Sequence, residues 1–365
     1  MKGAIIRALS LVVMGACMVV VGDMVPGTRS AEASEGTAGE RMSLREMAER
    51  KVHHGRDRFI NPFAPFDRRR IRLHAFLDQY LRWKLLSDNP YRPAYENERV
   101  EPVRIDWDKV ISHHSISITY LNHASVLVRE NGVGLLVDPV LFGLPPIKNY
   151  SPLAFRPDTM PAIDAVLITH GHYDHLDLRS LKAFQARARI LCPLGYGALI
   201  RKNGAGRVVE MDWLDTITIG PFEITFLPSN HWTMRNPIAG PNRALWGSYL
   251  IRSSSGRAIY LSGDTAYFDR FAEIGQRHPI DLAIFNLGAY EPRWFMQHSH
   301  INPQETVKAF KELGAQKLMV VHWGTFRLGD EPVYLPMLDI RREMAKAGLS
   351  HRLVPLKHGQ TYIIE

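Results

Sequence analysis

Residues 168–177, ITHGHYDHLD, place three histidines and two aspartates directly after a short apolar run. If that run is a strand, side-chain alternation points His170 and His172 to one side before the chain turns, with Asp174 and His175, toward a helix. A lone histidine is more often a hydrogen-bonded polar group than a ligand. Two histidines at i and i+2 followed by Asp-His are too dense for that reading. The stretch therefore predicts a metal site at the end of a strand.

Three later strand ends carry similar groups: LPSNHW contains His231, YLSGDTAY contains Asp264, and LMVVHWG contains His322. With the first cluster they make five histidines and two carboxylates, which is enough for two metal ions. Imidazole and carboxylate without thiolate favour Zn²⁺, and iron or manganese is also compatible. Two such ions lower the pKa of bound water toward about 7, so this set of residues predicts a hydrolase.

The pattern from Ser115 onward predicts an α/β sandwich. Short β-branched runs read as strands, and helical segments at 178–188, 266–278 and 302–314 lie between them. In the last segment Asn302 can cap, Pro303 suits the first turn and Glu305 can complete a capping box. Strand meanders followed by βα units give layered sheets covered by helices.

The composition is that of a soluble globular protein, with 45% hydrophobic and 22% charged residues in a chain of 365. The net charge of +8 favours an anionic partner, namely nucleic acid, a membrane surface or an acidic substrate. No nuclease-type motif accompanies the charge, so we expect no nucleic acid partner. The oligomeric state is not predicted.

Residues 1–33 resemble an export signal or an N-terminal anchor. Lys2 and Arg7 precede an apolar stretch at 8–21, and Ala31-Glu32-Ala33 resembles a cleavage site. Met14-Gly15-Ala16-Cys17 resembles a lipoprotein attachment box. We therefore expect an exported or membrane-associated protein, periplasmic if the source is bacterial, with lipidation of Cys17 as an alternative.

Residues 34–110 form a linker followed by a basic, aromatic extension, and residues 111–365 form the main domain. Arg68, Arg69, Arg70 and Arg72 lie among aromatic residues in FINPFAPFDRRRIRLHAFLDQYLRWKLL. One reading is an amphipathic face directed at anionic lipid. The other is a helix that packs its aromatic residues on the main domain and leaves its arginines in water.

The ligand order His-x-His-x-Asp-His, His, Asp, His resembles the metallo-β-lactamase superfamily, whose fold is a four-layer αβ/βα sandwich. The resemblance implies two groups of ligands, one for each ion, with Asp264 bridging the ions. The first group is His170, His172 and His231, and the second is Asp174, His175 and His322.

Flanking motifs such as DRFINPF, NHASVLV, SGDTAYF and GAYEPRWFM resemble the N-acylphosphatidylethanolamine-hydrolysing phospholipase D group over about residues 56–362. GAYEPRWFM, residues 288–296, discriminates best, because membership of the superfamily does not require it. The resemblance places this segment beside the active site, with His300 contacting the substrate phosphate or the leaving group. Gln297, His298 and Ser299 depart from the vertebrate-like pattern. The segment's candidate substrate-binding residues are Tyr290, Glu291, Trp294, Phe295, Met296 and His300.

The resemblance implies hydrolysis of a phospholipid phosphodiester by a hydroxide that bridges two zinc ions, giving phosphatidic acid and an N-acylethanolamine. Asp174, Asp264 and His300 are the candidate catalytic residues, with His300 as proton donor or phosphate contact. His123 and Asp138 are candidates to orient a metal-bound imidazole. Asp138 also suits a turn before Pro139, and His123 a buried structural role.

Four alternatives remain open. A phosphorylated sugar-acid lactonase or a general phosphodiesterase would use a similar two-metal site, and the same chemistry could open a β-lactam. A catalytically silent, membrane-associated binding protein would keep the fold without turnover, although none of the seven ligand positions is missing.

Overall fold

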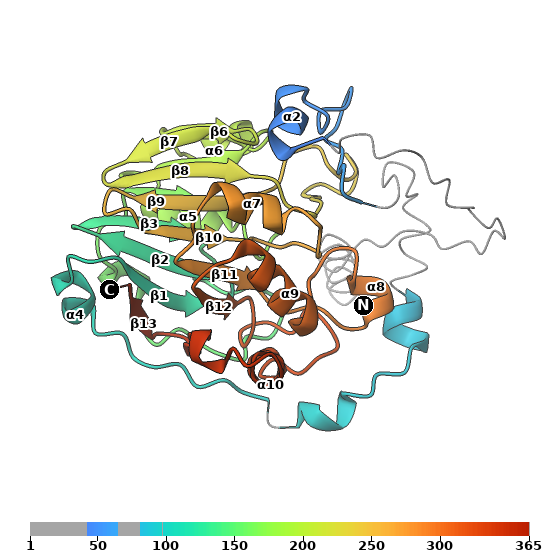
Figure 1. Ribbon diagram of the computed structural model, residues 1–365. Coiled ribbons are helices and arrows are strands. Elements are labelled where there is room, and N and C mark those ends of the chain that lie inside the picture. Colours follow the sequence, from blue (N-terminus) through green and yellow to red (C-terminus); the bar gives the residue numbers. More distant parts are fainter. Residues whose placement is uncertain (1–41, 65–80, 97, 365) are drawn as a thin grey trace, which may run out of the picture.

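Two facing β-sheets with helices on their outer faces make up the protein in the computed structural model, which describes residues 42–64, 81–96 and 98–364 (Figure 1). The first sheet has the strand order β13-β1-β2-β3-β4-β5-β6. Strands β13, β1, β2 and β3 pair antiparallel, whereas β3 to β6 pair parallel. The strands are β1 (Ser117–Asn122), β2 (Ser125–Glu130), β3 (Val133–Val137), β4 (Ala165–Leu167), β5 (Arg189–Pro193), β6 (Val208–Met211) and β13 (Thr361–Ile363).

The second sheet has the order β12-β11-β10-β9-β8-β7. Strands β7 to β10 form an antiparallel meander, and β10, β11 and β12 pair parallel through helical connections. The strands are β7 (Thr216–Ile219), β8 (Phe222–Leu227), β9 (Ser248–Ser253), β10 (Ala258–Leu261), β11 (Leu282–Asn286) and β12 (Lys317–Val321).

Helices cover both outer faces. Helices α4 (Trp107–Ser112), α5 (Leu178–Phe184) and α6 (Gly197–Lys202) contribute to an apolar cluster with the first sheet. Helices α7 (Phe271–Arg277), α9 (Pro303–Leu313) and α10 (Leu335–Lys346) lie over the second sheet (Figure 1). The layers run helix, sheet, sheet, helix, which confirms the predicted four-layer sandwich.

Side-chain alternation in β4 shows how the first sheet is buried on both faces. Ala165 and Leu167 face the core between the sheets, whereas Val166 faces the helical layer. A strand covered on both sides needs apolar residues at every position, and for this reason AVLI, residues 165–168, reads as a continuous apolar run. The polar residues of ITHGHYDHLD begin only where the strand ends.

Helix α9 follows the predicted signals. The side chain of Asn302 accepts from the backbone N–H of Glu305, the Glu305 side chain completes the capping box, and Gly314 ends the helix at φ 63°. The helix expected over 266–278 begins later, at Phe271. One reason is that the N–H of Ala266 donates to the carbonyl of Asn230, so that this part of the chain belongs to a loop.

The described part of the N-terminal extension packs on the main domain. Phe63 lies 5.9 Å from the ring of Trp213, and Trp83 lies 4.8 Å from Phe295. The four arginines at 68, 69, 70 and 72 and the candidate export signal lie outside the described residues, so their roles and the domain boundaries stay predictions. The remaining short elements are α2 (Leu44–Glu49), η2 (Arg82–Leu86), η3 (Arg92–Tyr95), η4 (Pro157–Thr159), α8 (Arg293–Met296) and η5 (Ser350–Arg352).

Within the described ranges, none of the helices has both the length and the apolar character needed to cross a bilayer.

We expect Phe285→Ala to destabilise the protein by about 3–5 kcal/mol, because the Phe285 ring on β11 is fully buried against Tyr260 and Phe271 and its loss leaves a cavity. Urea unfolding of the two proteins measures the change. Ile238→Ala is the control, since Ile238 is 98% exposed and its loss should change the unfolding free energy by less than about 0.5 kcal/mol. Equal midpoints for both variants would contradict this account of the core.

Candidate metal centre

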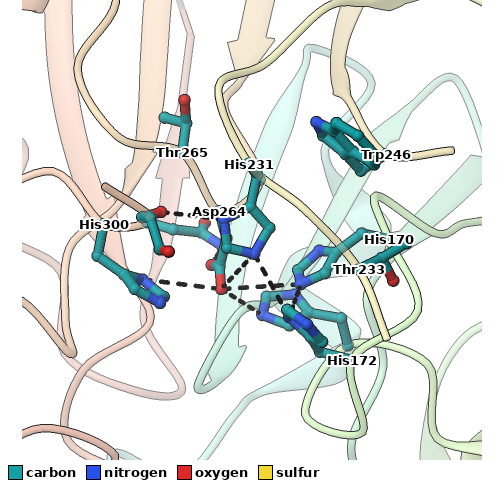
Figure 2. A network of polar contacts seen from close by, with 12 residues as sticks. His170, His172, His231, Thr233, Trp246, Asp264, Thr265 and His300 are labelled. Carbon is teal, nitrogen blue, oxygen red and sulfur yellow. Dashed lines mark hydrogen bonds and ion pairs between the residues drawn. The ribbon is translucent and has the colours of Figure 1, made fainter. Parts of the chain in front are cut away.

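All seven predicted ligands meet at one end of the sandwich, where strands from both sheets end. His170 to His175 follow β4, Asp264 follows β10, and His322 directly follows β12. His231 lies in the loop after β8. The seven side chains are nearly inaccessible to solvent. Figure 2 shows the imidazoles of His170, His172 and His231 turned toward the carboxylate of Asp264.

The first group consists of His170, His172, His231 and Asp264, whose ligand atoms lie within 4.8 Å of one another. His172 Nδ1 is 2.9 Å from His170 Nε2 and 3.4 Å from His231 Nε2. Asp264 Oδ2 is 3.8 Å from His170 Nε2 and 3.9 Å from His231 Nε2. These atoms surround a position that suits a cation with three nitrogen ligands and one oxygen ligand.

The second group contains Asp174, His175 and His322. Asp174 Oδ2 is 3.4 Å from His175 Nε2 and 3.3 Å from His322 Nε2. Asp264 reaches this group too, with Oδ2 3.3 Å from His175 Nε2 and Oδ1 3.3 Å from His322 Nε2. The carboxylate of Asp264 therefore lies between the two groups, as a bridging ligand would.

Hydrogen bonds at Nδ1 select the tautomer of three imidazoles, those of His170, His175 and His231. Thr169 Oγ1 donates to Asp138 Oδ2, so His170 Nδ1 donates to Thr169 Oγ1. His231 Nδ1 donates to the carbonyl of Ser299 at 3.0 Å. His175 Nδ1 donates to Asp138 Oδ2 at 2.8 Å. When neutral, each of these rings therefore presents an Nε2 lone pair to the centre, which is the state that a metal ligand needs.

The buried carboxylates of the centre also indicate bound cations. Burial would raise the pKa of Asp264, but the charges of His175 and His322 outweigh burial and hold that pKa well below its ordinary value. Burial would lower the pKa of His175, but the carboxylates of Asp264 and Asp174 outweigh it and raise the pKa well above its ordinary value. Burial, with the charge of His175, lowers the pKa of His170 far below its ordinary value. Two ionised carboxylates buried in this centre need a positive charge beside them, which a protonated His175 or a coordinated cation supplies.

Unpaired donor atoms test whether the residues fit metal ions. His175 Nε2 is buried and makes no hydrogen bond within the described part of the chain. An imidazole nitrogen left in this way, beside two carboxylates, is accounted for by a coordinated ion. Nitrogen and oxygen donors without sulfur fit Zn²⁺, and they also fit iron or manganese. The residues therefore fit two metal ions, with the identity of the metal left open.

His123 and Asp138 lie directly behind the ligands. Asp138 accepts from His175, as expected for a residue that orients an imidazole, and it also accepts from the N–H of Thr169 at 2.8 Å. His123 Nε2 instead lies 3.1 Å from Asp174 Oδ2, and its ring lies 4.1 Å from the ring of His322. His123, Asp138 and His322 all have positive φ, at 41°, 40° and 69°. Such backbone strain in three residues of one site is typical of a functional centre.

The GAYEPRWFM segment contributes to the site in different ways. His300, which follows it, lies inside the centre, with Nδ1 3.9 Å from Asp264 Oδ2 (Figure 2). Trp294 is 46% exposed, whereas Phe295 and Met296 are fully buried in a cluster with Trp83. The cluster forms packing behind the site. Contact of Phe295 and Met296 with substrate stays a prediction.

Tyr290 and Glu291, the first two candidate substrate-binding residues of the segment, make hydrogen bonds outside the two metal groups. The hydroxyl of Tyr290 donates to Asp339 Oδ2 at 2.8 Å, toward α10. Glu291 Oε2 accepts from the N–H of Arg293 at 2.8 Å. Their contact with substrate likewise stays a prediction.

The sequence analysis missed two residues that support the ligands. Asn286, the last residue of β11, donates from Nδ2 to Asp264 Oδ1 at 2.8 Å. Thr169, which lies within ITHGHYDHLD, connects Asp138 with His170. A polar residue at the end of an apolar strand was the only signal for Asn286, and that signal alone does not identify its partner.

Known proteins resemble this chain in sequence and in fold. A family model described as the β-lactamase superfamily domain matches residues 134–323. An N-acylphosphatidylethanolamine-hydrolysing phospholipase D of Caenorhabditis elegans is 32% identical over 262 residues, covering 66% of this chain and 72% of that protein. An uncharacterised protein of Mycobacterium tuberculosis is 31% identical over 351 residues, covering 90% of this chain and 89% of that protein.

Among solved structures, the metallo hydrolase Igni18 of Ignicoccus hospitalis is similar with a TM-score of 0.55 and 19% identity. The match covers 69% of this chain and 99% of that one. At this identity the likeness supports the fold alone.

We expect Asp138→Asn to lower the affinity for the ion of the second group by about 10–100-fold, as is usual for residues that orient a metal ligand. Asp138 accepts three hydrogen bonds, from the N–H and hydroxyl of Thr169 and from His175 Nδ1. An amide would set its NH₂ group against one of these donors. Titration of the metal-free protein with Zn²⁺ against a coloured chelator measures both affinities. Asp158→Asn, on an exposed ion pair with Arg156, is the control, and equal affinities in the two variants would refute the role of Asp138.

Proposed function

We propose a substrate on the basis that the chain belongs to the metallo-β-lactamase superfamily and is a metal-dependent hydrolase. The proposed reaction is the cleavage of a phospholipid phosphodiester. The proposed substrate is N-acylphosphatidylethanolamine, and the products are an N-acylethanolamine and phosphatidic acid. The observation that carries the choice of substrate is the 32% identity to the nematode phospholipase D, across 66% of this chain. We propose zinc as the metal, with iron and manganese as alternatives.

The two groups of ligands assign the metal-binding roles in this proposal. His170, His172 and His231 would hold one ion, and Asp174, His175 and His322 the other, with Asp264 shared. Bound there, the ions would polarise phosphate oxygens and lower the pKa of a water molecule toward about 7. Asp138, Thr169 and the carbonyl of Ser299 hold the imidazoles in the required tautomers. The protein thus prepares the ligand geometry before substrate arrives.

His300 is the proposed contact for the phosphate or the leaving group. It is 5% exposed, and its ring lies 5.5 Å from that of His231 and 5.9 Å from that of His322. His300 lies beside both groups of ligands and belongs to neither. A phosphate bound between the two metals would therefore lie next to this side chain. Its ring N–H can donate to a phosphate oxygen or to the departing alcohol oxygen.

We also propose that the enzyme works at an anionic membrane surface. Leu85 and Leu86 on η2 are 71% and 77% exposed, and Trp294 on α8 is 46% exposed. The contact of Trp83 with Phe295 holds η2 beside α8, so these apolar side chains lie on neighbouring elements. Large exposed apolar residues near a lipid-hydrolysing centre suit entry into the head-group region. The candidate signal at 1–33, or a lipid on Cys17, would bring the protein to that surface.

We expect His175→Ala and Asp264→Asn to abolish hydrolysis of N-acylphosphatidylethanolamine, because each removes a ligand from the centre. Mass spectrometry of the products from a mixed phospholipid panel, with metal-loaded protein, identifies both the substrate and the bond that is cut. Lys182→Gln, a change on helix α5 away from the centre, is the control and should retain full activity.

Each other result of that assay identifies an alternative. Unchanged turnover in His175→Ala would reject the role of the centre. Cleavage of phosphorylated sugar-acid lactones or simple phosphodiesters, but of no phospholipid, would favour a different hydrolase. Two bound ions without turnover on any ester would favour a binding protein.

We expect replacement of Arg68, Arg69, Arg70 and Arg72 by Gln to weaken binding to vesicles of anionic lipid, because each arginine near such a surface contributes about 1 kcal/mol. Sedimentation with anionic and with neutral vesicles measures the difference. Leu85→Ser combined with Leu86→Ser should weaken binding to both kinds of vesicle, since it removes apolar contact. Binding that is the same for all three proteins would remove the membrane proposal.

A further inference from the structure

Asn61, in the N-terminal extension, touches the backbone of a metal ligand. Its Nδ2 donates to the carbonyl of His231 at 2.8 Å and to Asn230 Oδ1 at 2.9 Å. The N–H of Phe63 donates to Asn61 Oδ1 at 2.9 Å, which sets the orientation of the amide. The two hydrogen bonds that this side chain donates therefore fix the loop of His231 relative to the extension.

Asn230 passes this contact on to the loop of Asp264. Its N–H donates to Thr265 Oγ1 at 3.1 Å, and its carbonyl accepts from the N–H of Ala266 at 2.8 Å. Figure 2 shows Thr265 next to Asp264, on the same chain segment. The loops that carry two ligands of the first group are therefore joined at the residue that Asn61 binds.

A second contact with the same loop comes from Phe59. Its N–H donates to the carbonyl of Asn242 at 2.7 Å. The N–H of Asn242 in turn donates to the carbonyl of Thr233 at 2.6 Å, two residues beyond His231. The extension therefore binds the chain on both sides of this ligand.

The other end of the extension is held by Asp212, in the turn after β6. Its Oδ1 accepts from His53 Nε2 at 2.6 Å, and its Oδ2 accepts from His54 Nε2 at 2.8 Å and from Lys51 Nζ at 2.6 Å. The ring of His53 stacks on Trp213 at 4.1 Å. The imidazole of His53 is buried and Asp212 is 6% exposed, so three hydrogen bonds and an aromatic stack attach the extension to the main domain.

His53, His54 and Asp212 are close enough to hold a metal ion, but the contacts favour an anchor. The ammonium group of Lys51 already lies beside Asp212 Oδ2, where it supplies the positive charge. Asp212 Oδ1 also accepts from the N–H of Trp213 at 2.8 Å. A carboxylate with four donors around it has little capacity left for a cation.

We propose that residues 43–64 are a structural arm of the metal centre, in which Asn61 is a positioning residue for His231 and, through Asn230, for the Asp264 loop. Asp212 is the anchor of this arm. The inference rests on the proposed metal-dependent function, and it assigns to the extension a role in holding the ligands of the first group in place.

Metal affinity and a spectrum test the arm without relying on turnover. We expect Asn61→Ala and Asn61→Asp to lower the affinity for the first ion by about tenfold or more, because a residue that orients a ligand has been removed. In Asn61→Asp the carboxylate cannot donate, so it faces two acceptors. We expect the absorption spectrum of the Co²⁺-substituted protein to change in both variants, since the geometry around His231 changes. Competition with a coloured chelator gives the affinities.

Asp212→Asn is the variant that tests the anchor, because Asp212 is not among the ligands of either group. We expect it to lower the same affinity by a smaller factor. Arg56→Gln is the matched control, since Arg56 is exposed and lies in the same segment. It should bind metal as the parent does. If Asn61→Ala does not fold, the comparison of Asp212→Asn with Arg56→Gln decides the proposal.

Three outcomes would overturn the arm: parental affinity and spectrum in both Asn61 variants, an equal loss in Arg56→Gln, or the loss of a third equivalent of metal in Asp212→Asn. The last would make the anchor a metal site. A parent protein that binds two ions but hydrolyses no phospholipid would contradict the proposed substrate while leaving the arm intact. A parent that hydrolyses phospholipid while its Asn61 variants keep full affinity would contradict the arm alone.

Discussion

The carboxylate of Asp264 is the group on which the rest of the structure depends. Its two oxygens lie within 3.9 Å of His170, His175, His231 and His322, which come from both sheets. A buried carboxylate is tolerated only when positive charge and hydrogen bonds surround it. The two sheets must therefore end at the same edge and bring their loops within a few ångströms of one atom.

Close approach at this edge limits which residues the loops accept. Gly263, next to Asp264, has φ 56°, and a Cβ there would lie 2.9 Å from the Cβ of Thr169 and 3.0 Å from the carbonyl oxygen of Gly247. Only glycine allows the β10 loop to lie against the β4 loop without displacing either. The positive φ values of Asp138 and His322 have the same origin, because the chain must turn sharply where the strands end.

The layered fold, and the strand ends at which the candidate ligands lie, could be predicted from the sequence for local reasons. Histidines spaced by two after an apolar run mark a strand end, and Asn302 with Glu305 marks the start of a helix. Period-two alternation and capping act over a few residues, so they are visible in the sequence. The start of α7 was expected too early, because the bond between Ala266 and Asn230 joins segments 36 residues apart, and local patterns do not contain such a bond.

The sequence by itself determined which residue types can bind metal and which strand ends carry them. Only the tertiary structure decided which partner each one has: Asp138 with His175, Asn286 with Asp264, and Asn61 with the backbone of His231. It also decided that Phe295 is buried while its neighbour Trp294 reaches solvent. Such choices depend on distances between segments far apart in the chain, and these distances are set by the packing of the two sheets against each other.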